Sequence, residues 1–126
     1  MGSERWDRGA EKIRELSGPD ALERVEEVAK GAPDLGRWIV EFIFGDIYSR
    51  PGLSLRDRQI ANVAALTALG TAPGTLRVHI NGALNAGVSE EEVLEIVLQM
   101  AAYAGFPAAA NALAVAREVF AHRVAR

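Results

Sequence analysis

The sequence predicts an all-α protein of six or seven helices. Apolar residues recur at helical spacing through almost the whole chain, and no segment alternates apolar and polar residues convincingly at period two. Glycine, proline and serine stand between the periodic segments, where helices start and stop. With 126 residues, of which 49% are hydrophobic and 25% charged, the chain has the length and balance of one folded domain.

Three helices are expected before residue 49. Residues 3–16 and 19–30 form short, charged, amphipathic segments with a Gly-Pro step between them. Residues 34–48 are much more apolar, so we expect this helix to enter the core. We expect Gly45 to end or bend it, and the SRPG run at 49–52 to form a turn.

Four more helices are expected after this turn. Ser54 precedes Asp57 in a capping-box-like pattern, and Ser89 with Glu92 forms a capping box. Glycine suits the residue just after a helix because it adopts positive φ without strain. The expected helices are 55–69, 73–86, 89–104 and about 107–124, and Gly70, Gly87 and Gly105 end the first three.

The composition excludes several functions. Zero cysteines rule out disulfides, thiol catalysis and thiolate metal sites, and only two histidines disfavour a His-rich metal centre. A net charge of −3 offers no broad cationic surface for nucleic acid. No apolar run is long enough to span a membrane, and the N-terminus lacks an apolar signal region, so we expect a cytoplasmic protein.

Polar residues within the apolar helices are the candidates for a site. Gln59 on one expected helix, His79 on the next and Tyr103 on a third lie where the pattern favours carbon. Because buried polar groups need partners, we expect these helices to bring their polar faces together. Each residue also has a structural interpretation: a core histidine with satisfied hydrogen bonds, an interhelical glutamine or a core tyrosine.

Alanine-rich faces point to association between subunits. The expected helices carry more apolar surface than one small core can bury, and alanines such as Ala64 and Ala65 allow helices to approach closely. Alanine also occurs simply because it favours helix. We predict a symmetric homo-oligomer.

Two stretches carry a family resemblance. GDIYSRPGLSLRDRQIANVAALTALG and LRVHINGALNAGVSEEEVLEIVLQMAAYAGFPAAANALAVAREVF resemble the carboxymuconolactone decarboxylase family within the alkylhydroperoxidase D-like superfamily. The likeness covers about residues 38–120. We therefore interpret residues 38–124 as the family core of a single domain and residues 1–37 as an N-terminal helical arm.

The chain resembles the decarboxylase branch of this superfamily more than the peroxidase branch. Peroxidase members carry a C-x-x-C pair followed, after three residues, by a histidine; counting back from His79, those positions hold Ala72 and Thr75. The spacing places all three on one helical face, but without sulfur we expect no thiol peroxidase activity. The acidic partner that the resemblance leads one to expect on the preceding helix is also missing, and Gln59 is the nearest candidate.

The resemblance implies an all-α homo-oligomer, a trimer or a hexamer built as a trimer of dimers, with sites lined partly by a neighbouring chain. It also implies a reaction without a cofactor or metal. In that reaction, 4-carboxymuconolactone loses carbon dioxide to give 3-oxoadipate enol-lactone in protocatechuate catabolism. The expected partner is thus a small carboxylated lactone, and neither nucleic acid nor membrane.

This chemistry needs a proton donor and groups that bind carboxylates. We predict His79 and Arg58 as catalytic residues, with His79 the general acid because histidine titrates near neutral pH. Arg58 or Arg50 would bind the substrate carboxylates, which the guanidinium fork matches. The further substrate-binding candidates are Tyr48, Arg77 and Tyr103.

Two other functions stay open at this point. The chain could be a family enzyme with different small-molecule chemistry, for example in secondary metabolism. It could also be a helical oligomer that binds a ligand or partner protein without catalysis. His122 is expected to be structural, since it stands in the last turn of the final helix, where a cation is favoured.

Overall fold

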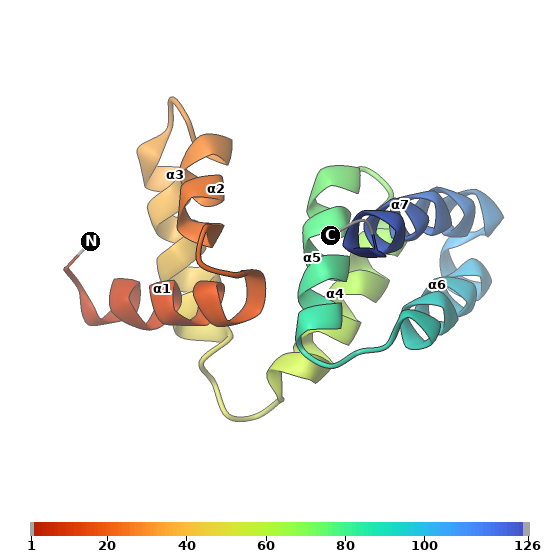
Figure 1. Ribbon diagram of the computed structural model, residues 1–126, viewed down its shortest axis with the longest axis horizontal. Coiled ribbons are helices and arrows are strands. Elements are labelled where there is room, and N and C mark those ends of the chain that lie inside the picture. The colour runs from red at the N-terminus through yellow and green to blue at the C-terminus, as the bar shows by residue number, and fades with distance from the viewer. Residues whose placement is uncertain (1, 125–126) are drawn as a thin grey trace. The chain divides into compact units, whose positions relative to one another are not determined.

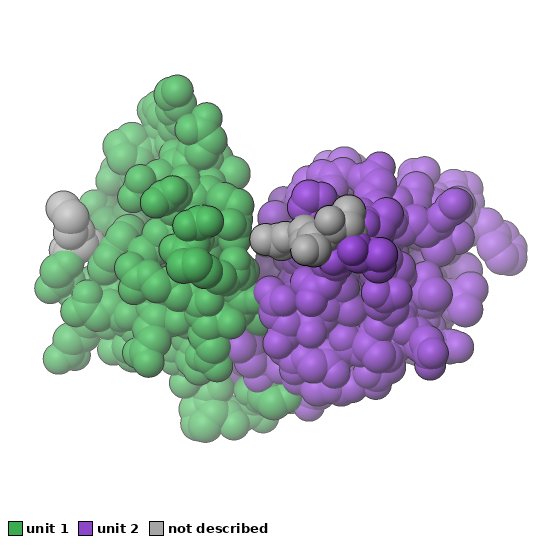
Figure 2. All heavy atoms as spheres, in the orientation of Figure 1, with its two compact units in different colours: residues 1–54 green, residues 55–126 purple. Residues whose placement is uncertain are grey.

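A computed structural model describes residues 2–124 and divides the chain into two compact units. Residues up to Ser54 form unit 1 and residues from Leu55 onward form unit 2, as the two colours of Figure 2 show. No strand occurs within residues 2–124, so the all-α prediction is confirmed. No helix in this part of the chain is long and apolar enough to cross a membrane.

Unit 1 contains three α-helices and a π-helical segment (Figure 1). The elements are α1 (Glu4–Ser17), α2 (Ala21–Val28), α3 (Pro33–Trp38) and η1 (Ile39–Ile47), and η1 directly continues α3. The Ser3 side chain caps α1 by accepting a hydrogen bond from the Trp6 N–H at 3.0 Å. The same hydroxyl donates to the buried carboxylate of Glu41 at 2.8 Å, which ties the start of α1 to η1.

Two glycines allow α1 and η1 to pack backbone against backbone. A Cβ on Gly9 would lie 2.0 Å from the Val40 carbonyl oxygen, and a Cβ on Gly45 would lie 2.4 Å from the Arg5 carbonyl oxygen. The expectation that Gly45 ends its helix is wrong, because η1 continues to Ile47 and Gly45 is buried inside it. The physical reason for glycine here is close approach, and helix termination plays no part.

Unit 2 contains the four helices expected after the turn. They are α4 (Leu55–Leu69), α5 (Pro73–Asn85), α6 (Glu90–Ala104) and α7 (Phe106–Val124). Their core is aliphatic, and its most buried members are Val63, Ile80, Ala83, Val93, Ala112 and Ala116. Within this unit α4 packs on both α5 and α6, and α7 packs on α6 and α5 (Figure 1).

The helix ends in unit 2 follow local sequence chemistry. The capping box of α6 is confirmed: the Glu92 N–H donates to the Ser89 hydroxyl at 3.0 Å, and the Ser89 N–H donates to the Glu92 carboxylate at 2.9 Å. The hydrogen bond from the Ser89 backbone N–H lowers the pKa of Glu92 below its ordinary value, and the Arg56 guanidinium on α4 lowers it further. Gly87 and Gly105 follow α5 and α6 with φ of 99° and 95°, as the sequence predicted.

Candidate active site

The centre of the candidate site is a hydrogen bond between His79 on α5 and Gln59 on α4. His79 Nδ1 and Gln59 Oε1 lie 2.9 Å apart. The Gln59 side chain is 0% exposed, on the same face of α4 as Val63, whereas His79 is half-buried. The expectation that the polar faces of these two helices meet is confirmed.

This contact defines the state of the imidazole. A glutamine carbonyl oxygen only accepts hydrogen bonds, so Nδ1–H of His79 is the donor, and Nε2 carries the lone pair of the neutral ring. Burial lowers the pKa of His79 from its ordinary value of 6.5 because the interior disfavours the charged form. The resting ring is therefore neutral at pH 7, and it must first take up a proton at Nε2 before it can donate one.

The two positions that the peroxidase branch fills with cysteine both precede His79 in the chain and carry no sulfur here. Ala72 is the residue that precedes the first turn of α5, and Thr75 is exposed in that turn. Ala72 thus stands at the helix boundary. Neither side chain carries a thiol, so the exclusion of thiol chemistry rests on the sequence itself.

The other predicted site residues lie in different surroundings. Arg58 is half-buried on α4, next in sequence to Gln59. Arg77 points to α7, where its guanidinium donates to the Glu118 carboxylate at 2.8 Å. Tyr103 is 81% exposed at the end of α6, so the interpretation of Tyr103 as a core aromatic is wrong for the single chain. Gln99, one turn earlier, is also exposed, and α6 does not join the buried polar contact of α4 and α5.

The two candidates near the turn belong to unit 1. The Tyr48 ring is buried edge-on against Phe44, with ring centroids 4.8 Å apart and planes at 70°. Arg50 is exposed just after the end of η1. Asp46, crowded into the same stretch, forms a two-pronged ion pair with Arg5 of α1, with the closest atoms 2.9 Å apart. That guanidinium lowers the pKa of Asp46.

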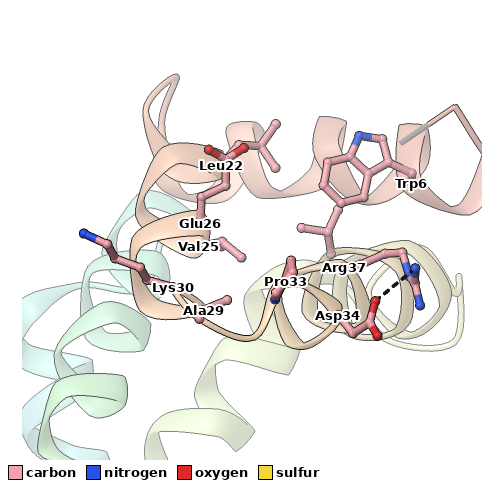
Figure 3. Close-up of a pocket in the computed structure, with 12 residues that line it drawn as sticks. Trp6, Leu22, Val25, Glu26, Ala29, Lys30, Pro33, Asp34 and Arg37 are labelled. Atoms are coloured by element: carbon pink, nitrogen blue, oxygen red, sulfur yellow. Dashed lines mark ion pairs between the residues drawn. The ribbon is translucent and has the colours of Figure 1, made fainter.

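Unit 1 contains a cavity that the sequence did not indicate (Figure 3). It measures about 650 Å³ and is bounded by α1, α2, α3 and the start of η1. Figure 3 shows Trp6, Leu22, Val25 and Pro33 around it, with the Arg37–Asp34 ion pair at its edge. None of the six predicted site residues lines this cavity.

Geometry and sequence together define an all-α protein whose half-buried histidine is paired with a buried glutamine and has no thiol beside it. The chain belongs to the carboxymuconolactone decarboxylase family, which it matches over residues 33–118. It is 35% identical to the 4-carboxymuconolactone decarboxylase of Acinetobacter baylyi, over 93% of this chain and 87% of that protein. This alignment is longer than the stretch from 38 to 120 that carried the resemblance.

Two other relatives have diverged to a similar degree. One is the nitrosuccinic acid decarboxylase of Metarhizium robertsii, 30% identical over 90% of this chain and 79% of that protein. The other is an uncharacterized 15.0 kDa protein of Paracoccus denitrificans, 33% identical over 73% of this chain and 69% of its own length. Two of the three relatives therefore carry the name of a decarboxylase, with different substrates.

Proposed function

We propose that this protein is a decarboxylase that acts on a small carboxylated lactone, with 4-carboxymuconolactone as substrate and 3-oxoadipate enol-lactone as product. The observation that carries the proposal is the 35% identity to the enzyme of that name over nearly the whole chain. In a cell, this reaction belongs to the protocatechuate branch of aromatic catabolism.

The named substrates of the two decarboxylase relatives share a chemical property that supports catalysis without an external electron sink. In 4-carboxymuconolactone, the departing carboxylate is attached to the carbon next to a double bond, and that double bond is conjugated with the lactone carbonyl. In nitrosuccinic acid, a carboxylate shares its carbon with a nitro group. When the bond to carbon dioxide breaks, its electron pair moves into the carbonyl or the nitro group, so the substrate itself stabilises the charge. The protein has to bind carboxylates and deliver one proton.

His79 is the residue we assign to proton delivery. Its Nε2 takes a proton from solvent, and the imidazolium transfers that proton to the dienolate carbon beside the lactone carbonyl. The ring then returns to the neutral form with Nδ1–H still bonded to Gln59. Because burial lowers the pKa of His79, the imidazolium is a stronger acid than a solvated one, at the cost of a smaller protonated population.

Arginine side chains supply the carboxylate-binding groups of this proposal. Arg58 lies in the same turn of α4 as Gln59 and is half-buried, which strengthens its charge interactions relative to a solvated arginine. Arg50 is an exposed second candidate. Arg77 already pairs with Glu118, so we assign it a weaker, supporting role.

We also propose that the active unit is a homo-oligomer, a trimer or a trimer of dimers. Leu98, Tyr103 and Phe106 on α6 and α7 are 63%, 81% and 81% exposed, and covering them would remove apolar surface from water. A neighbouring chain on this surface is the means by which Tyr103 could reach a substrate. Native mass spectrometry gives the subunit number, and a monomer at micromolar concentration would contradict the proposal.

The deciding experiment measures carbon dioxide release from authentic 4-carboxymuconolactone, with nitrosuccinic acid as the comparison substrate. We expect turnover of the lactone, and its absence would refute the substrate assignment. In the His79→Gln variant, kcat should fall by roughly 10² or more, the usual contribution of a general acid. His122→Gln is the matched control, because His122 is exposed in the last turn of α7 and should leave kcat unchanged. Unchanged turnover in a folded His79→Gln protein would refute the role of His79.

A further inference from the structure

Gln59 is unusual among the residues of the unit 2 core because it is polar, fully buried and only half satisfied. Its Oε1 accepts the hydrogen bond from His79, but its Nε2 is buried and has no hydrogen-bond partner within the described residues. A buried amide donor without a partner costs roughly 1–3 kcal/mol. An apolar side chain would avoid this cost, so the glutamine is better explained by its contact with His79 than by the stability of the core.

We infer that Gln59 is a positioning residue: through its Oε1, it holds His79 in the tautomer with hydrogen on Nδ1 and leaves Nε2 as the nitrogen that takes up and releases the proton. The catalytic consequence rests on the proposed function. The assignment of the tautomer does not, because it follows from the 2.9 Å contact and from the inability of a carbonyl oxygen to donate.

The hydrogen bond suits a proton cycle that occurs entirely at Nε2. Nδ1 carries hydrogen in the neutral ring and in the imidazolium, so Gln59 can keep the same contact in both states. The ring therefore need not rotate or change tautomer between taking a proton from solvent and giving it to the substrate carbon. A ring with the opposite tautomer would have to lose the contact with Oε1, because Nδ1 would then face that oxygen with a lone pair.

The choice of an amide instead of a carboxylate also has a consequence. A carboxylate at this distance would favour the imidazolium by its charge, whereas glutamine is neutral at every pH of interest. Gln59 thus orients the ring without placing a negative charge beside its protonated form. The resting site is a neutral pair with one basic nitrogen, Nε2.

Nitrogen-15 NMR of histidine-labelled protein tests the tautomer without any substrate. The chain has only two histidines, so His122→Gln assigns the signals. In free histidine the Nε2–H tautomer predominates; in this protein above the pKa of His79, we expect the opposite form, with Nδ1 protonated and Nε2 not. Gln59→Met, which keeps a similar volume, should shift His79 toward the Nε2–H form. Gln99→Met, which removes an exposed glutamine on α6, is the matched control and should change nothing.

Gln59→Glu is the conservative variant, because it keeps the hydrogen-bond acceptor that Gln59→Met removes. It retains an acceptor, so the Nδ1–H tautomer should persist, while its charge raises the pKa of His79 and moves the pH profile of turnover upward. With the lactone, Gln59→Met should lower kcat by roughly tenfold or more, up to the full contribution of the general acid, and change KM little. Circular dichroism of both variants establishes that they fold.

The results separate this inference from the proposed function. An Nε2–H tautomer in the wild-type protein, or an unchanged tautomer in folded Gln59→Met, would overturn the positioning role whatever the protein turns over. The expected tautomers in all variants establish that role, and a failure to decarboxylate the lactone would then refute only the substrate.

Discussion

Replacing Gly9 by alanine tests whether α1 and η1 depend on direct backbone packing. The new Cβ would lie 2.0 Å from the Val40 carbonyl oxygen and 2.8 Å from the Val40 carbonyl carbon. Contacts of carbon with these atoms below 3.0 Å do not persist in proteins, so α1 has to move away from η1 by at least about 1 Å. The obstacle is backbone, which cannot rotate aside as a side chain can.

The expected loss of stability can be estimated from two opposing effects. Overpacking of a well-packed contact costs about 1–3 kcal/mol, and the upper part of that range applies to a clash with backbone. Alanine in place of glycine within a helix returns up to about 1 kcal/mol. We therefore expect Gly9→Ala to lower the free energy of unfolding of unit 1 by roughly 2 kcal/mol.

Tryptophan fluorescence during urea unfolding isolates this effect, because both tryptophans, Trp6 and Trp38, lie in unit 1. Gly9→Ala should move the fluorescence transition to lower urea. Gly52→Ala is the control within the same unit: a Cβ at Gly52, in the turn after η1, meets nothing within 4 Å, so the fluorescence transition should stay where it is. A Gly9→Ala protein with an unshifted fluorescence transition would refute the packing argument.

Three further predictions concern unit 2. Burial lowers the pKa of His79 below 6.5. If the imidazolium is the working form, kcat/KM should therefore fall as pH rises through that lowered pKa, with a midpoint below 6.5. A kcat/KM that instead increased with pH between about 5 and 7 would identify the neutral imidazole as the working form. The same lowered pKa means that the folded protein favours the neutral His79 ring. The free energy of unfolding of the wild-type protein, relative to that of His79→Gln, should therefore decrease as pH falls from 6.5 through the folded-state pKa. Urea unfolding at several pH values measures this difference. Thr67 on α4 is 1% exposed and its hydroxyl has no hydrogen-bond partner within the described residues, so Thr67→Val should stabilise the protein by roughly 1 kcal/mol in thermal unfolding. A destabilised Thr67→Val protein would contradict this prediction.

Much of the fold could be predicted from sequence because helix ends depend on neighbours a few residues away. Ser89 caps α6 through Glu92, three positions later, and Gly105 ends that helix through its own backbone conformation. The contact between Gln59 and His79 was also within reach, since each is a polar residue on an apolar helical face. The family followed from the motifs around the same residues.

The sequence by itself determined the helices, the absence of thiol chemistry and the histidine of the candidate site. Only the tertiary structure decided which groups these residues meet. Gly45 read as a helix end because local sequence cannot show that α1, some 40 positions earlier, lies against it. Arg77 pairs with Glu118 on α7, and Gln59 Oε1 lies beside Nδ1 of His79; the sequence alone shows neither contact. Such outcomes depend on distances between atoms far apart in the chain, and residue spacing along a helix does not contain them.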